Sequence, residues 1–408
     1  MGLIRPIYPV ETLTLANFKL IKKAQFEFSR FNILIGPNGS GKSSIVHGLA
    51  YVAQLLGNTT PYVIPKNITE LRNRGQPNQP FSIIIKGKVP ALLSESVRVI
   101  HPSFFDSLLF EFSLRVTERQ RQYFKLKLLL PDSSELDIHK AGEKYTIPGT
   151  NYTIRIDQHG HVVLPFRTSQ STVSYVSQPA ENLVENSIRS SIRLFVPTLR
   201  GRVEYSTQPG VLGPDFSGIF TLIAGDPSFK GKLGELLSRI LGYKIDLELR
   251  YIEQERGWAL ENQAISPSIN YAIEAFGAHQ LTYLLAYLLS ASTGHLITIE
   301  EPEIHLHPKA QSKLVEVLAD YAKDKNIQLI ITTHSEHILL KFLNLVAKGV
   351  IDSKELKVYY FEREEPFYAH IEELEVTAKG ELKGGLKGFF EEEVKLLEEY
   401  IKARASRG

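Results

Sequence analysis

The sequence predicts an α/β fold, a mixed and mainly parallel sheet flanked by helices, and three observations support it. An apolar, strand-like run over 31–35 leads into a glycine-rich loop and then a helical segment over 43–56. A second apolar run over 296–300 ends in two acids. From residue 268 onward, helical and strand-like segments alternate, which is the order of βαβ units around a parallel sheet.

The segments before residue 268 add strands and a few helices to this core. Residues 11–35 and 81–100 have the pattern of short strands around the first helix. Residues 101–175 are strand-like and carry turn residues near 131–133, 141–142 and 159–160. Residues 180–195 and 228–241 have helical patterns. We therefore expect an inserted β-rich arm and a helical, lid-like subdomain.

The segments after residue 268 complete the α/β unit. We expect helices over 272–290, 309–323 and 336–347, strands over 296–300 and 327–331, and an amphipathic helix over 388–405. The chain then divides into an N-terminal lobe (1–100), the β-rich arm with the helical subdomain (101–267), and a C-terminal lobe (268–408).

The loop after the first buried strand has the pattern of a nucleotide-phosphate site. Residues 36–43, GPNGSGKS, match G-x-x-x-x-G-K-[ST] between a strand and a helix, the context that this motif requires. The glycines let backbone N–H groups approach phosphates, and the helix N-terminus adds a positive dipole end. Lys42 is expected to reach the β- and γ-phosphates, and the Ser43 hydroxyl to ligate Mg²⁺.

Two adjacent acids follow the second strand and predict the chemistry at the γ-phosphate. A carboxylate at the tip of a buried strand can hold Mg²⁺ through water, a role that we predict for Glu300. The neighbouring Glu301 can polarise the attacking water. Two adjacent acids at a buried strand end are costly without a cation, which favours this interpretation over a solvated turn.

Several stretches resemble the ABC-type ATPases of the RecF, SMC and OLD group, which are P-loop NTPases. Residues 296–311 (LITIEEPEIHLHPKAQ) and 329–339 (LIITTHSEHIL) are similar to the C-terminal half of these proteins, and residues 12–49 to the N-terminal half. Residues 195–206 and 276–285 resemble single-chain members of the group. The resemblance is weakest between about residues 90 and 190.

The resemblance implies a role for each matching residue. Residues 36–44 would form the Walker A loop, residues 302–307 a D-loop that faces a partner subunit, and residues 277–280 a signature segment that caps ATP on the opposite subunit. The implied catalytic residues are Glu301, His334 as the switch histidine, and Lys42. The implied metal residues are Ser43 and Glu300, and the implied nucleotide-binding residues are Gly36, Asn38, Gly39, Ser40, Gly41, Lys42, Ser43, Ser44, Gly277, His279 and Gln280.

Two positions depart from the pattern of the group. Glu300 replaces the usual Asp, and its longer side chain can still serve Mg²⁺ through water. His279 replaces the usual Ser, and the segment lacks the usual glycine pair. A protonated His279 could donate to the γ-phosphate across a dimer, and this contact would weaken as the pH rises. The alternative is that His279 faces a neighbouring helix.

The resemblance implies that ATP and Mg²⁺ drive head-to-tail homodimerisation and that hydrolysis resets it. By analogy with the group, the coupled partner is DNA or a nuclease, in repair or phage defence. We expect no Toprim nuclease within this chain. Two alternatives are a non-hydrolysing, ATP-gated scaffold and a transporter ATPase subunit. The missing signature argues against the transporter.

Composition is that of an ordinary intracellular enzyme. The 408 residues carry a net charge of +2 and no Cys, so disulfides and thiolate metal sites are excluded. The N-terminus lacks the apolar region of a signal peptide, and the apolar run over 281–291 is too short to span a bilayer. We expect a cytoplasmic protein without a membrane partner.

Local basic clusters and two neighbouring histidines each have two interpretations. The first cluster comprises Arg115, Arg119, Arg121, Lys125 and Lys127, and the second Arg189, Arg193, Arg200 and Arg202. Either could bind a nucleic-acid backbone. An exposed, charged strand pair or hairpin is the favoured explanation of the first, and Arg200 of the second could instead face the nucleotide or a subunit interface. His305 and His307 could share a metal, but Pro308 favours the start of a helix there.

Overall fold

The computed structural model of the chain describes most of both ends and separate pieces of the middle. The described residues are 8–58, 60, 62, 68–88, 109–117, 122–130, 132, 134–137, 140, 142–147, 153–159, 161–167, 173–179, 188, 191–197, 219–252, 257–264, 267–270, 276–384 and 391–405. Arg119, Arg121, Arg189, Arg200 and Arg202 lie outside them.

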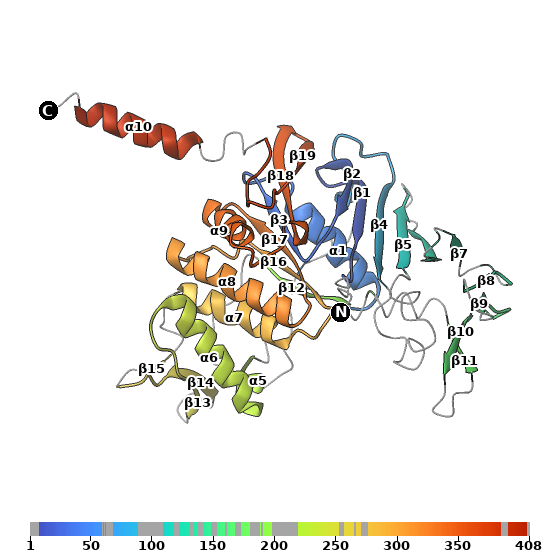
Figure 1. Cartoon of the computed structure of the whole chain (residues 1–408), viewed down its shortest axis with the longest axis horizontal. Helices are drawn as coiled ribbons and strands as arrows, with labels where there is room; N and C mark the ends of the chain where they lie inside the picture. Colours follow the sequence, from blue (N-terminus) through green and yellow to red (C-terminus); the bar gives the residue numbers. More distant parts are fainter. Residues whose placement is uncertain are drawn as a thin grey trace.

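A six-stranded sheet forms the centre of the molecule (Figure 1). Its order is β12 (Ile192–Val196), β16 (Leu296–Glu300), β17 (Gln328–Thr333), β3 (Phe31–Ile35), β18 (Leu356–Glu365) and β19 (Tyr368–Leu374). The first five strands are parallel, and β19 returns antiparallel to β18. All residues of β3, β16 and β17 are buried, as expected for strands covered on both faces.

Helices cover one face of this sheet, and a helix with a second sheet covers the other (Figure 1). Helices α7 (Phe276–Ser290), α8 (Pro308–Asp324) and α9 (Glu336–Ala347) pack on the first face, and α6 (Pro227–Leu241) packs on α7 and α8. Helix α1 (Ser43–Leu55) lies on the second face. Within β3, Phe31, Ile33 and Ile35 enter the first core, and Leu34 enters the second.

The second sheet is antiparallel and packs over α1. Its order is β2 (Ile21–Glu27), β1 (Thr12–Phe18), β4 (Phe81–Lys88), β5 (Leu109–Val116), β6 (Gln122–Leu129) and β7 (Glu135–Asp137). In β1 and β4 one face is buried and the other is half-exposed, so apolar residues alternate with polar ones.

The remaining described elements lie at the periphery. A four-stranded sheet contains β8 (Lys144–Thr146), β9 (Thr153–Ile156), β10 (His161–Arg167) and β11 (Val173–Pro179). A three-stranded sheet contains β13 (Leu247–Ile252), β14 (Gly257–Asn262) and β15 (Ile269–Asn270), near α5 (Ile219–Gly225). Helix α10 (Glu391–Ala405) projects from the body (Figure 1), and its Tyr400 is 62% exposed.

The structure confirms the α/β fold and most of the predicted elements after residue 268. Strand β16 and helix α9 have the predicted bounds, and α8 begins at Pro308, where the His307 ring accepts a hydrogen bond from Lys309 N at 3.3 Å. The prediction of a helix over 180–195 is wrong at its end, because residues 192–195 belong to β12, which pairs with β16. Strands β18 and β19 have no counterpart among the predicted elements.

The three-part division of the chain remains a prediction. The antiparallel sheet joins β4 to β5 across the expected boundary at residue 100, and β12 from the middle segment completes one edge of the central sheet. Between residues 109 and 179, every regular element in the described ranges is a strand. Among the described residues, every helix is too short or too polar to cross a bilayer.

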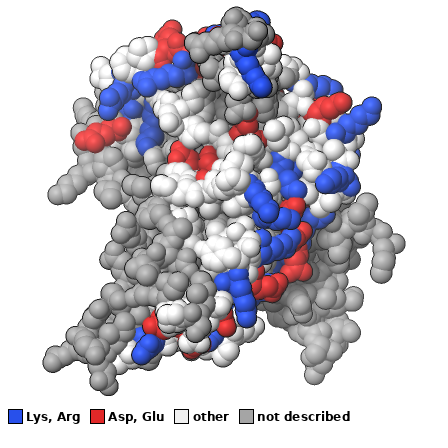
Figure 2. Space-filling view, turned by 90° about the vertical axis from the view of Figure 1, so that its left-hand side faces the viewer, with Lys and Arg blue, Asp and Glu red and all other residues white. Residues whose placement is uncertain are grey.

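Charged side chains of both signs are interspersed on the described surface seen in Figure 2. Ion pairs join neighbouring helices: Arg239 of α6 lies 2.9 Å from Asp320 of α8, and Lys341 of α9 lies 2.6 Å from Glu316 of α8. Opposite charges in contact therefore neutralise each other locally between these helices.

Candidate functional site

The predicted site residues converge because three parallel strands end at the same edge of the central sheet. Ile35 of β3 is in register with Thr333 of β17, and Thr332 with Glu300 of β16. The residues that follow these strands, from Gly36, Glu301 and His334 onward, therefore meet at the carboxyl edge. In open α/β sheets this edge is where ligands bind.

The loop after β3 requires glycine at its first position. Gly36 has φ of +152°, and a Cβ there would lie 2.0 Å from the carbonyl oxygen of Phe361 in β18. Gly39 also has positive φ, +72°, but a Cβ there would meet only the end of the Arg363 side chain at 3.7 Å. The loop backbone thus packs tightly against β18 at Gly36, whereas there is room for a Cβ at Gly39.

We expect Gly36→Ala to destabilise the protein more than Gly39→Ala does. Both changes carry the strain of positive φ, about 1–3 kcal/mol, but only Gly36→Ala forces backbone atoms apart. The free energies of unfolding from denaturant titrations measure the difference. Equal losses of stability in the two variants would contradict the tight packing against β18.

Lys42 lies within the loop and holds it closed. Its Nζ donates to the carbonyl oxygens of Gly36 at 2.8 Å and Pro37 at 2.9 Å. Burial lowers the pKa of Lys42 to about 8, against the opposing charges of Glu301, Glu303 and Glu300. Ser40 Oγ is buried without a hydrogen-bond partner among the described residues, so a bound phosphate would satisfy it.

Glu300 and Ser43 lie together at the tip of β16. Glu300 is 4% exposed, and its carboxylate accepts hydrogen bonds from the hydroxyls of Ser43 and, at 2.7 Å, of Tyr62. Burial raises the pKa of Glu300, although these hydrogen bonds oppose the shift. A hydroxyl and a buried carboxylate in contact are oxygen ligands of the kind that Mg²⁺ takes, so the residues fit this ion.

Glu301 and His334 form a pair beside Lys42. The Glu301 carboxylate accepts from His334 Nε2 at 2.9 Å, and the same nitrogen lies 3.2 Å from Lys42 Nζ. Glu301 has φ of +45°, and its backbone N donates to Thr332 O at 2.8 Å. The backbone N of His334 donates to Glu303 at 2.7 Å. A strained non-glycine backbone held by such bonds is typical of functional sites.

A cavity of about 240 Å³ lies over these groups. It is lined by Lys19, Leu20, Asn38, Gly39, Gly41, Lys42, Ser43, Ser44, Glu301 and His334. The structure thus brings together one end of the predicted phosphate loop, Glu301 and His334. Glu300, Gly36 and Ser40 are not among the lining residues, and Glu300 contacts the lining through the Ser43 hydroxyl.

Lys19 and Tyr62 belong to the site although no motif marks them. Lys19 lies in the turn between β1 and β2 and contacts His47 of α1. Burial lowers the pKa of Lys19 to about 8, and the nearby Glu300 opposes this shift. Tyr62 follows α1 and reaches Glu300. Both depend on packing between segments that are distant in sequence, so spacing alone could not have found them.

The predicted signature segment lies apart from the cavity. His279 and Gln280 are each 1% exposed within α7, and a Cβ on Gly277 would lie 2.6 Å from the carbonyl oxygen of His305 in the predicted D-loop. The segment therefore packs on residues 302–307 of its own chain. This burial argues against the His279 side chain as a donor to a partner's phosphate and favours the alternative that it faces neighbouring elements.

Residues 10–146 and 248–339 of the chain match the AAA ATPase domain. These ranges contain the phosphate loop, both acids and His334, and they cover more than half of the chain. A stretch of 75 residues is 39% identical to structural maintenance of chromosomes protein 1B of Mus musculus; it is 18% of this chain and only 6% of that protein.

The fold is similar to solved heads of SMC proteins. The SMC head domain of Thermotoga maritima matches with a TM-score of 0.44 and 12% identity over 89% of this chain and 98% of that chain. The SMC head bound to the C-winged helix domain of ScpA matches with a TM-score of 0.52 and 14% identity over 90% and 98%. With the domain match over more than half of its length, the chain belongs to the AAA ATPase domain family, and its fold is similar to that of an SMC head.

Proposed function

We propose that this chain binds ATP with Mg²⁺ and hydrolyses it, and that ATP drives two copies together. The contact between Glu301 and His334 beside Lys42 carries the proposal, since a carboxylate and an imidazole next to the loop lysine would act as base and hydrogen-bond donor at a γ-phosphate. Ser43 and Glu300 would hold Mg²⁺, which would neutralise charge on the phosphates.

Each protein group has a separate task in this proposal. Lys42 and the loop N–H groups bind and orient the phosphates. Glu301 accepts the proton of the attacking water, and His334 holds the Glu301 carboxylate in place through its Nε2–H. Tyr62 fixes the Glu300 carboxylate at 2.7 Å. We further propose, from the family, that the cycle is coupled to DNA or to a partner nuclease.

A steady-state phosphate-release assay on the parent chain tests hydrolysis directly. Release that depends on ATP and Mg²⁺ supports the proposal. Tight ATP binding without release would support a non-hydrolysing, ATP-gated scaffold, the alternative that the unusual signature segment favours.

Dimerisation is tested by sedimentation of the Glu301→Gln variant with and without ATP. The resemblance to the RecF, SMC and OLD group supports a second subunit that would cover the bound ATP. We expect the mass to double with ATP and Mg²⁺, and the mass of Lys42→Ala to stay unchanged under the same conditions. An unchanged mass of Glu301→Gln would exclude ATP-driven assembly.

A further inference from the structure

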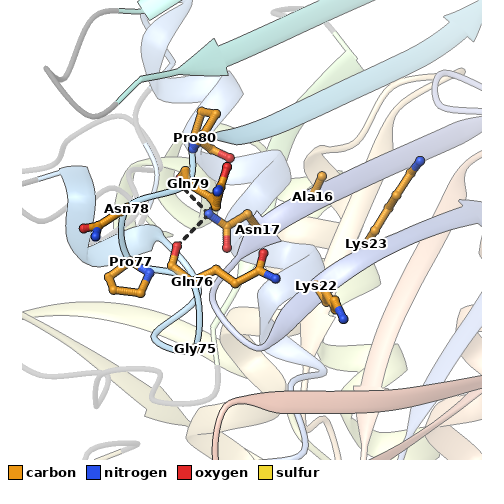
Figure 3. A pocket seen from close by; sticks show the side chains of 10 residues that line it. All are labelled: Ala16, Asn17, Lys22, Lys23, Gly75, Gln76, Pro77, Asn78, Gln79 and Pro80. Atoms are coloured by element: carbon orange, nitrogen blue, oxygen red, sulfur yellow. Dashed lines mark hydrogen bonds between the residues drawn. The ribbon is translucent and has the colours of Figure 1, made fainter.

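A cavity of about 480 Å³ lies at the end of the antiparallel sheet, under the loop that precedes β4. Figure 3 shows its lining: Ala16, Asn17, Lys22, Lys23, Gly75, Gln76, Pro77, Asn78, Gln79 and Pro80. These ten residues include two lysines, four amides and no acid. Such a volume is in the range of small-molecule sites.

Asn17 builds this cavity by holding the loop. Its Nδ2 donates to the carbonyl oxygens of Gln76 at 3.1 Å and Gln79 at 2.6 Å (Figure 3), and Asn73 N donates to Asn17 O at 2.9 Å. Asn17 is 4% exposed and has φ of +54°, a conformation that Asn tolerates. Its Oδ1 has no hydrogen-bond partner among the described residues, which leaves a buried acceptor beside the loop.

A row of residues extends from the cavity across the exposed face of the sheet. Register places Lys23 opposite Ala16, Ala16 opposite Ser82, and Ser82 opposite Arg115. We call these four residues the outer row. Both cations are exposed, with small side chains between them. They are separated by three strand spacings, roughly 14 Å, a distance over which a nucleic-acid strand presents several phosphates.

The charges at the other end of the same face are already neutralised. Lys86 lies 3.0 Å from Glu111, and Lys127 is paired with Glu135. The outer row is instead followed by Gln25, Thr14, Ile84, Ser113 and Lys125, which include no acid. Positive charge available to a polyanion is therefore concentrated near the cavity.

We propose that the outer row and the cavity bind single-stranded nucleic acid, with the backbone on Lys23 and Arg115 and one base in the cavity. The amide side chains of Gln76 and Asn78 in the lining would hydrogen-bond the base, and Lys22, also in the lining, would contact the adjoining phosphate. The inference rests on the proposed coupling to DNA and specifies where and in which form the strand binds.

The test compares two double variants in titrations of a fluorescent mixed-sequence oligonucleotide. Lys23→Ala/Arg115→Ala should weaken binding about tenfold or more, and it should make the salt slope shallower by roughly 0.7 for each phosphate that the variant no longer binds. Lys86→Ala/Lys127→Ala removes the same charge from the same face and should change the affinity by less than about twofold. Equal weakening by the two double variants would overturn the proposal.

A second pair of variants tests the cavity. Ala16→Phe fills it and should weaken single-strand binding without changing the salt slope, whereas Thr14→Phe on the same face should not. Equal binding of duplex and single strand, with no effect of Ala16→Phe, would overturn the base site. A parent chain that releases phosphate from ATP but binds no oligonucleotide at low salt would overturn this inference and leave the ATPase proposal standing.

Discussion

Glu301→Gln is expected to reduce phosphate release by roughly 10²–10⁴-fold while ATP binding persists. The amide keeps the size of the carboxylate and can remain beside His334, but it cannot accept the proton of the attacking water. Glu300, Ser43 and Tyr62 are unchanged, so the proposed metal site stays intact. Steady-state phosphate release and equilibrium binding of labelled ATP measure the two properties separately.

The neighbouring Glu303 provides the matched control for this variant. Its carboxylate accepts from the His334 backbone N rather than from the ring, so Glu303→Gln should lower the rate far less. Parental turnover by Glu301→Gln would show that another group is the base.

Lys42→Ala is expected to lose ATP binding, by about tenfold to a hundredfold in affinity, because a charge-assisted hydrogen bond to phosphate is worth roughly 1.5–3 kcal/mol. Lys42 also donates to two loop carbonyls, so its removal leaves these oxygens unsatisfied. ATP affinity is therefore measured by calorimetry. The free energy of unfolding of the nucleotide-free protein is measured in parallel.

Two further variants separate binding from folding. Lys42→Met keeps the aliphatic stem and should lose affinity with a smaller loss of stability. Lys379→Ala removes an exposed lysine from the turn after β19 and should retain full affinity. If Lys42→Ala binds ATP as the parent does, the phosphate loop has been assigned wrongly.

The parts of the site that a short segment encodes could be predicted from the sequence. The phosphate loop needs glycines at fixed positions, and β16 and β17 are apolar runs bounded by polar residues, so their ends are visible in the chain. Parallel pairing then brings Glu301 and His334 to the same edge.

The parts that depend on long-range packing could not be predicted. Residues 192–195 lie within a stretch with a helical pattern, but pairing with β16 makes them a strand. Tyr62, after α1, and Lys19, in the turn between β1 and β2, come near Glu300 although both are more than 200 residues away in the sequence. The burial of His279 depends equally on how α7 lies against residues 302–307, which its own sequence does not reveal.

The position of β3 in the central sheet has a consequence for how the chain folds during synthesis. Residues 31–35 pair on one side with residues 329–333 and on the other with residues 356–360. Until the ribosome has released residues 329–333, neither edge of β3 has its native partner, and until it has released residues 356–360, the phosphate loop has no β18 to pack on. Such long-range parallel pairing folds slowly and exposes strand edges meanwhile. We therefore expect the nascent N-terminal half to need chaperones, and nucleotide binding to begin only after β18 has been made.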